Sequence, residues 1–219
     1  MRFTLPTGHE CEFVGSEGSR TSRGLVVICD ILGLRPLFDD LVARLAREHD
    51  RPVVGVDPWA AHLDTDLAWR FENAGVLEDD SILADVLAAA DLTGAEQVDV
   101  IGFCMGGMYT FKAAGTGRFH RAAAFYGMIH VPDRWAGAGQ HDPLDALRSP
   151  SVCPTLAILG GQDSMTPADD IEELRQVGVE VVVYDDAEHG FVHDPSRPAH
   201  RPADAADAWT RVFAFLDAN

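Results

Sequence analysis

The sequence VDVIGFCMGGMY, residues 98–109, reads as a short buried strand, a tight turn flanked by glycines and the start of a helix. Its centre follows the pattern glycine, any residue, nucleophile, any residue, glycine, with Cys104 at the position of the nucleophile. A sharp strand-to-helix turn strains the backbone of the central residue, so its neighbours Gly102 and Gly106 must lack side chains. The thiol would lie at a helix N-terminus, where the dipole and free N–H groups favour a thiolate and a developing oxyanion. Cys104 is therefore the candidate nucleophile, with an inert core cysteine as the alternative.

Outward from this turn, strand and helix patterns alternate along nearly the whole chain. Strand patterns lie at residues 25–29, 52–56, 98–103, 122–126, 155–159 and 179–184, and the first of these is a continuous apolar run that fits a strand buried on both faces. Helical patterns lie between or after them, at residues 36–49, 81–92, 105–114, 168–176 and 203–217. The alternation predicts an α/β fold with a mostly parallel central sheet covered by helices on both faces.

Three segments fall outside this alternation. Residues 1–20 are expected to hold one or two short edge strands, and residues 60–78 a loop with one helical turn near residues 67–71. Residues 128–150, which contain three prolines, are expected to form a long surface excursion. No internal repeat or linker interrupts the pattern, so residues 1–219 are expected to form a single domain.

A cysteine nucleophile requires a general base, and the base requires a group that holds its tautomer. His189 follows the last predicted strand and is followed by glycine, while Asp163 follows the preceding strand. Asp163 alone could be a helix N-cap, and one of nine histidines can occupy such a position by chance. The order nucleophile, acid, histidine is that of α/β-hydrolases, and all three residues come at carboxyl ends of strands, where parallel sheets bind ligands. Together they predict a Cys-His-Asp triad.

The chain resembles the dienelactone hydrolase family of α/β-hydrolases over residues 25–219. The motifs that carry the resemblance are GFCMGG at 102–107, FYG at 125–127, GGQD at 160–163, EHGF at 188–191 and DAW at 207–209. The resemblance implies the α/β-hydrolase fold, and it implies hydrolysis of small lactones or esters of the carboxymethylenebutenolidase type. It implies Cys104 as nucleophile, His189 as general base and Asp163 as the residue that orients it. It further implies an oxyanion hole formed by the backbone N–H groups of Ile31 and Met105, with no metal or organic cofactor.

The chain departs from the family pattern at two positions. Where the family has a glutamate close to the cysteine that takes part in its activation, this chain has Asp30. Where the family has a substrate-binding arginine four residues after the histidine, it has His193, which is mostly neutral near pH 7. A second carboxylate-binding arginine would fall within residues 60–78, where Arg70 is the candidate. We therefore expect neutral esters or lactones to be hydrolysed better than carboxylated ones.

Composition narrows the partners. With 17 basic and 35 acidic residues the formal net charge is −18, which disfavours nucleic acid and anionic membranes as partners. The family resemblance implies a small-molecule ester or lactone as the substrate. The four cysteines form no C-x-x-C pair, and the H-x-x-x-H spacing of His189 and His193 lies in a predicted loop, so no metal site is expected. The N-terminus lacks the apolar run of a signal peptide and no segment has transmembrane length, so a cytoplasmic location is expected. Nothing in the sequence indicates an oligomeric state.

Two alternative functions remain at this point. One is a general short-chain carboxylesterase or thioesterase on the same fold, which would differ only in its pocket. The other is a non-catalytic binding protein with the α/β-hydrolase fold, which the presence of Cys104, Asp163 and His189 together disfavours.

Overall fold

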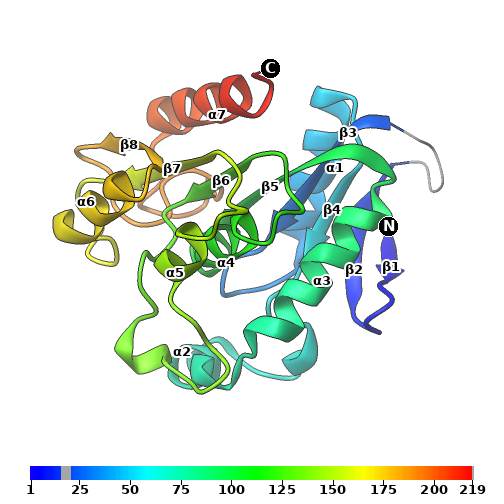
Figure 1. The fold of residues 1–219 in the computed structure, drawn as a ribbon, viewed down its shortest axis with the longest axis horizontal. Coiled ribbons are helices and arrows are strands. Elements are labelled where there is room, and N and C mark those ends of the chain that lie inside the picture. Colours follow the sequence, from blue (N-terminus) through cyan, green and yellow to red (C-terminus); the bar gives the residue numbers. More distant parts are fainter. Residues whose placement is uncertain (16–20, 219) are drawn as a thin grey trace.

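Runs of valine, isoleucine and alanine form the centre of an eight-stranded sheet (Figure 1). The computed structural model describes residues 1–15 and 21–218. The strands are β1 (Arg2–Thr4), β2 (Glu10–Val14), β3 (Thr21–Ile28), β4 (Val53–Val56), β5 (Ala95–Phe103), β6 (Ala122–Phe125), β7 (Thr155–Gly160) and β8 (Glu180–Tyr184). Their order across the sheet is β1-β2-β4-β3-β5-β6-β7-β8. Pairing is antiparallel for β1 with β2 and for β2 with β4, and parallel for all other neighbours.

Helices cover both faces of this sheet, as the alternating pattern predicts. The α-helices are α1 (Pro36–His49), α2 (Leu67–Asn73), α3 (Asp79–Leu92), α4 (Met105–Ala114), α5 (Pro143–Leu147), α6 (Ala168–Gln176) and α7 (Pro202–Leu216). Short 3-10 turns occur at η1 (Ala60–His62), η2 (Ala74–Val76) and η3 (Asp133–Trp135). The α/β fold predicted from the sequence, with a mostly parallel sheet and helices on both faces, is confirmed by this arrangement.

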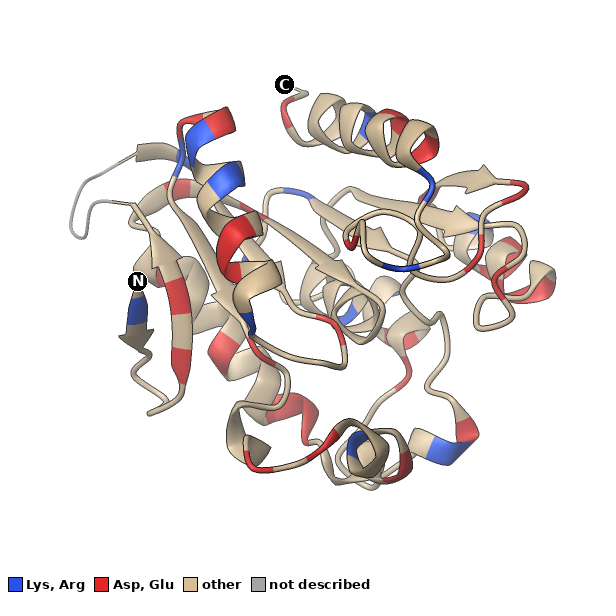
Figure 2. Cartoon of the chain, turned by 180° about the vertical axis from the view of Figure 1, so that it is seen from behind, with Lys and Arg blue, Asp and Glu red and all other residues tan. Residues whose placement is uncertain are grey.

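Helices α1 and α7 share one face of the sheet, and α3 and α4 share the other (Figures 1 and 2). Between α1 and α7, the ring of His49 stacks on Phe213 at 3.4 Å, and the guanidinium of Arg44 lies 5.3 Å from the ring of Trp209. Trp209 in turn packs on Phe125 of the central sheet, with ring centroids 4.9 Å apart. These contacts join α1 and α7 into one layer and attach that layer to the sheet.

The predicted excursion over residues 128–150 is only partly a surface segment. Trp135 is fully buried there, and its indole nitrogen donates a 3.0 Å hydrogen bond to the carbonyl of Phe71. Gln140 likewise donates to the carbonyl of Ala74 at 2.6 Å. The expectation of an exposed loop was wrong for this part because prolines and glycines mark a break in regular structure and do not report burial. The two irregular segments, 60–78 and 128–142, therefore pack on one another beside the sheet.

The carboxyl edge of the sheet gathers the polar residues that follow its strands. Asp30 follows β3, Cys104 follows β5, Tyr126 follows β6 and Asp163 follows β7. Their strands are adjacent and parallel, so these residues come to the same edge of the sheet. None of the helices in the described part of the chain combines the length and the apolar character needed to cross a membrane.

Candidate active site

The turn between β5 and α4 holds Cys104 in a strained backbone conformation. Its φ is 56° and its ψ is −117°, in a region that residues with a side chain rarely adopt. A Cβ atom at Gly102 would lie 2.2 Å from the carbonyl oxygen of Gly106, and one at Gly106 would lie 2.2 Å from that of Ile28. The flanking glycines are thus required by the close approach of backbone to backbone, as the sequence pattern predicts. The turn presents the thiol, which is 7% exposed as a residue, to a cavity above the sheet edge.

His189 and Asp163 meet beside this thiol. The ring nitrogen Nδ1 of His189 lies 2.7 Å from Oδ2 of Asp163, while Oδ1 of Asp163 accepts a 2.9 Å hydrogen bond from the backbone N–H of Met165. Because a carboxylate only accepts, Nδ1 carries the proton and donates it. The Asp163 side chain is fully buried, so its two partners fix both the position of the carboxylate and the tautomer of the histidine.

The remaining ring nitrogen of His189, Nε2, is buried and has no hydrogen-bond partner of normal geometry in the described part of the chain. Burial opposes protonation of the ring, but the interactions with Asp163 and Cys104 outweigh it and raise the pKa of His189 to about 10. A histidine with such a pKa is an imidazolium at neutral pH. The pair can therefore hold one proton ready for transfer at Nε2.

The backbone N–H groups of Ile31 and Met105 are each oriented by a hydrogen bond to the carbonyl of the preceding residue, which lies in the same peptide plane. The carbonyl of Asp30 accepts from the N–H of Gly33 at 2.9 Å, and the carbonyl of Cys104 accepts from the N–H of Met108 at 3.0 Å. In a trans peptide the N–H points opposite to the carbonyl, so each bond directs the N–H that follows it. Neither N–H has an acceptor among the residues that the structure describes. They are available to an anionic oxygen near Cys104.

Arg70 lies below this loop and not in the wall of the cavity. Its guanidinium sits 5.3 Å from the ring of Trp59 and donates through Nη1 to the carbonyl of Ile31 at 3.3 Å. Its Nε donates to the hydroxyl of Thr65 at 3.1 Å. With the side chain buried and two of its donors bonded, Arg70 is placed to hold the loop, and the sequence-based expectation of a substrate contact finds no support in its position.

Asp30 and His193 are bound to one another, and Asp30 lines the cavity whereas His193 does not. Nε2 of His193 lies 2.9 Å from Oδ2 of Asp30, and its Nδ1 hydrogen-bonds the hydroxyl of Tyr126. Arg35 donates to both carboxylate oxygens of Asp30, at 2.6 and 2.9 Å. Burial opposes the charge of Asp30, but the bonds from His193 and Arg35 outweigh it and lower its pKa to about 2. The negative charge of Asp30 is therefore neutralised by Arg35.

The cavity above Cys104 has a volume of about 300 Å³ and two kinds of wall. Its lining residues are Asp30, Ile31, Leu32, Arg35, Leu67, Phe71, Cys104, Met165, His189, Asp194 and Arg197. The apolar wall contains Leu32, Leu67 and Phe71, which are 40%, 42% and 37% exposed. Large apolar side chains left exposed around a cavity mark a binding surface.

Two arginines that line this cavity, Arg35 and Arg197, were not identified as site residues from the sequence. Arg197 lies against the backbone of Gly190, where a Cβ atom would meet its Nη1 at 2.4 Å, and no acidic side chain pairs with it in the described part of the chain. Arg35 precedes the first turn of α1 and is paired with Asp30. Their positions within loops that follow β3 and β8 were the available signal, but spacing within a loop does not tell where its side chains point.

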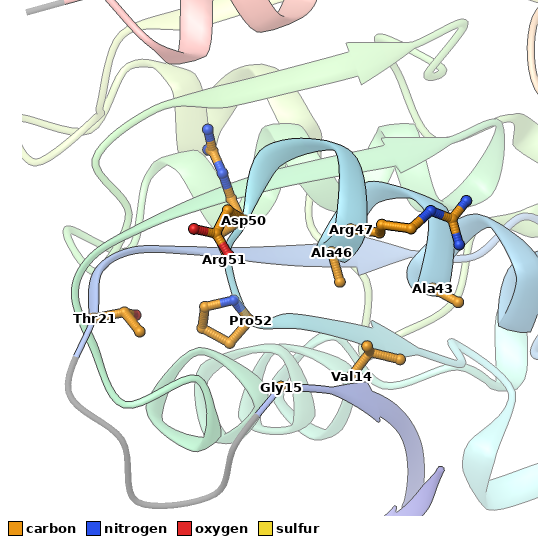
Figure 3. Close-up of a pocket in the computed structure, with 9 residues that line it drawn as sticks. All are labelled: Val14, Gly15, Thr21, Ala43, Ala46, Arg47, Asp50, Arg51 and Pro52. Carbon is orange, nitrogen blue, oxygen red and sulfur yellow. The ribbon is translucent and has the colours of Figure 1, made fainter.

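A second hollow of about 300 Å³ lies at the opposite end of the sheet (Figure 3). Its described lining includes Val14, Thr21 and Arg51 but no cysteine or histidine. Within residues 1–15 and 21–218, no three histidine, cysteine, aspartate or glutamate side chains are grouped so as to hold a metal ion.

The sequence of the chain matches a known protein family. The Dienelactone hydrolase family matches residues 58–219. A protein of Salmonella typhimurium named "Putative carboxymethylenebutenolidase" is 35% identical over 150 residues, which cover 63% of this chain and 54% of that protein. The match thus spans about half the length of that relative. A carboxymethylenebutenolidase of Rhodococcus opacus is 27% identical over 213 residues, with 88% of this chain and 80% of that protein covered.

Similarity to solved structures extends over the whole chain. The crystal structure named "Putative Dienelactone Hydrolase" from Klebsiella pneumoniae superposes with a TM-score of 0.86 at 23% identity, covering 100% of this chain and 98% of that one. At this level of identity the likeness concerns the fold.

Proposed function

Because this chain belongs to the dienelactone hydrolase family, we propose that it hydrolyses small esters or lactones with the thiolate of Cys104 as the nucleophile. The observation that carries the proposal is the combination at one cavity of a strained cysteine and a histidine held by a buried carboxylate. His189 and Asp163 are 2.7 Å apart, and Cys104 shares the cavity wall with His189. A single domain over residues 1–219, working on a small-molecule substrate, is part of the same proposal.

In the first step, the sulfur of Cys104 attacks the carbonyl carbon and forms a C–S bond. The carbonyl oxygen becomes an oxyanion, which the N–H groups of Ile31 and Met105 bind. The C–O bond to the leaving oxygen then breaks, and the imidazolium of His189 gives its Nε2 proton to the departing alkoxide. For a lactone, the leaving oxygen stays attached to the acyl chain. The product is an acyl-thioester on Cys104 and a neutral imidazole.

In the second step, neutral His189 takes a proton from a water molecule whose oxygen attacks the thioester carbonyl. The same two N–H groups bind the second oxyanion. Breakage of the C–S bond returns the thiolate and releases a carboxylic acid, and the proton stays on His189. Asp163 keeps Nε2 directed towards the sulfur through both steps without itself being protonated.

The walls of the cavity support a substrate with an apolar part and room for an anionic group. Leu32, Leu67 and Phe71 can cover an alkyl or aryl group, and the guanidinium of Arg197, which pairs with no carboxylate of residues 1–15 and 21–218, can bind a carboxylate of the substrate. On the basis of Arg197 we propose, in contrast to the sequence-based expectation, that carboxylated lactones bind well. Arg197→Gln should lower kcat/KM for a carboxylated lactone about tenfold and leave that for a neutral analogue unchanged. Equal effects on both substrates would exclude Arg197 as an anion-binding residue.

A general short-chain carboxylesterase remains the second candidate, because the apolar wall would accept neutral acyl esters as well. The test of the proposed function is hydrolysis of p-nitrophenyl acetate combined with mass spectrometry of the acid-quenched protein. We expect turnover, and an added acetyl group on the peptide that contains Cys104. Turnover without acylation of Cys104, or no turnover on esters and lactones, would contradict the proposal.

A further inference from the structure

A hydrogen-bonded network of four side chains extends from the cavity wall into the core behind Cys104. Arg35 donates to Asp30, Asp30 accepts from His193, and His193 is bonded to the hydroxyl of Tyr126. Tyr126 is fully buried, and the side chains of His193 and Asp30 are 0% and 5% exposed. The proposed reaction uses none of these four side chains.

The hydrogen-bonding protons of this network have one consistent arrangement. Asp30 is an ionised carboxylate and only accepts, so Nε2 of His193 carries a proton and donates it. Burial lowers the pKa of His193, so the ring is neutral and Nδ1 has a free lone pair. The hydroxyl of Tyr126, whose pKa burial raises, therefore donates to that nitrogen. Every polar atom between Tyr126 and Arg35 then has a partner of the correct kind.

The carboxylate of Asp30 has no acceptor position to spare. Oδ1 accepts from the backbone N–H of Leu32 at 2.9 Å and from Arg35 at 2.6 Å. Oδ2 accepts from Arg35 and from His193, both at 2.9 Å. A carboxylate offers about four lone-pair sites, and four donors occupy them. Asp30 is thus held in place and is not free to take the proton of the Cys104 thiol.

This hydrogen-bonded network connects the three loops that surround Cys104. Asp30 directly precedes Ile31, whose N–H faces the proposed oxyanion. His193 lies four residues after His189 on the same loop. Tyr126 follows Phe125, whose carbonyl accepts from the N–H of Cys104 at 3.0 Å. The ring of Tyr126 also meets that of His189 edge-on, with centroids 5.2 Å apart.

The backbone of Tyr126 indicates that its position is imposed by these neighbours. Its φ is 40°, which is uncommon for a bulky residue. Its N–H donates a 2.7 Å hydrogen bond to the carbonyl of Ile158 in β7. At the next residue, a Cβ atom on Gly127 would lie 2.4 Å from the backbone of Gly107 in α4. The sheet and α4 thus hold Tyr126 where its hydroxyl reaches His193.

We propose that Tyr126, His193 and Asp30 are positioning residues that keep the Ile31 N–H aligned with Cys104, and that Asp30 is not the base of the thiol. The inference rests on the proposed thiol hydrolase function. Misplacement of catalytic groups by about 1 Å costs about 100-fold in rate. Disruption of this hydrogen-bonded network should therefore slow the step in which the oxyanion forms.

The experiment measures two reactions of the same sulfur in the wild type, Tyr126→Phe and Asp30→Asn. Hydrolysis of p-nitrophenyl acetate requires both the thiolate and the oxyanion-binding N–H groups. Alkylation by iodoacetamide forms a C–S bond and expels iodide, so it requires the thiolate alone. Burial raises the pKa of the thiols of Cys11 and Cys153 to about 11 each, so both react slowly at neutral pH, and Cys104→Ala supplies the background. Tyr184→Phe is the matched control. The hydroxyl of Tyr184 donates a 2.7 Å hydrogen bond to Asp207, and neither residue lines the cavity.

We expect kcat for the ester to fall about tenfold in Tyr126→Phe and about 100-fold in Asp30→Asn, with KM and the alkylation rate within about twofold of wild type. Tyr184→Phe should change neither reaction. A parallel fall of alkylation and hydrolysis would overturn the inference, since it would make these residues part of thiol ionisation. An unchanged kcat, or a rise in KM at constant kcat, would overturn it as well. If Asp30→Asn does not fold, Tyr126→Phe decides alone. Absence of ester turnover in the wild type would instead contradict the proposed function.

Discussion

Two hollows of about 300 Å³ open at opposite ends of the same sheet, and they share neither chemistry nor backbone geometry. The hollow at the carboxyl end contains Cys104 at a φ of 56° and His189. The hollow at the amino end is lined by residues such as Thr21 and Arg51 that flank β3 and β4 (Figure 3). Equal volume therefore gives no indication of which hollow is a reaction site.

Both ends of the sheet also bury a carboxylate beside arginines. At the amino end, Asp99 in β5 is fully buried and lies 2.9 Å from Arg23, 3.4 Å from Arg51 and 3.3 Å from His120. Burial outweighs these partners and raises the pKa of Asp99. At the carboxyl end, the partners of Asp30 outweigh burial and its pKa is lowered to about 2.

The partners of Asp99 show an architectural role. Arg51 also binds Asp217 beyond the end of α7 at 2.6 Å, and Arg23 donates to the carbonyl of Leu216. The cluster thus ties the C-terminal helix to β5. Unpaired nitrogens do not separate the two ends, since Nε of Arg51 also lacks a partner in the described part of the chain. What separates them is the strained Cys104, which shares its cavity with a histidine held by a buried carboxylate.

The comparison is sharpened most by removing the nucleophile. Cys104→Ala should lower kcat for p-nitrophenyl acetate by a factor of at least about 1,000, because no other group can form the acyl intermediate. Cys104→Ser should retain the fold and lose most activity, because a hydroxyl is a far weaker acid than a thiol. Cys153→Ala, at another buried cysteine, is the control and should keep the wild-type rate. Wild-type turnover in Cys104→Ala would remove the distinction between the two hollows.

Removing the residue that orients the base should have a smaller effect. Asp163→Asn should lower kcat about 100-fold, and His189→Ala should come closer to Cys104→Ala, because the first disturbs orientation while the second removes the base. The measurement is steady-state hydrolysis of the same ester, with circular dichroism to establish folding. A variant Asp163→Asn as impaired as His189→Ala would indicate that Asp163 does more than orient the ring.

The amino end should respond in stability and not in catalysis. Asp99→Asn leaves Arg23 and Arg51 without their shared anion, and breaking a buried pair in this way costs about 3 kcal/mol. We expect the free energy of unfolding in urea to fall by about that amount, while kcat of the folded variant stays at the wild-type value. A loss of kcat without a loss of stability would mean that the amino end takes part in the reaction.

The smallest expected effect is a shift in the titration of His189. Cys104 contributes to raising the pKa of this ring to about 10, so Cys104→Ala should move that pKa towards its ordinary value of 6.5. A raised folded-state pKa stabilises the chain fully below pH 6.5 and loses this contribution as the pH rises towards 10. NMR titration of the His189 ring in both proteins measures the shift, and the His120 ring at the amino end is the internal control. An unchanged titration of His189 would show that it does not interact with the thiol.

Local sequence was sufficient for the elements of the fold. Helices α1 and α6 occupy the predicted ranges 36–49 and 168–176, because each carries apolar residues at helical spacing and Pro36 marks the start of the first. The central strands were equally readable, since strands buried on both faces are continuous apolar runs. The position of Cys104 in a strained turn also follows from sequence, because only glycines can stand where backbone approaches backbone.

Contacts between side chains on separate loops were decided by the tertiary structure alone. Asp30 and His193 are 163 positions apart in sequence and form a 2.9 Å hydrogen bond, which spacing along the chain cannot predict. Arg70 turned towards the core and Arg197 towards the cavity, although both are arginines in irregular segments. Helix and strand formation depends on neighbouring residues, whereas the direction of a loop side chain depends on strand order and on which partner can satisfy its charge once it is buried. The sequence therefore determined the sheet, the turn and the candidate nucleophile, while packing decided which charged groups face the cavity and which are held behind it.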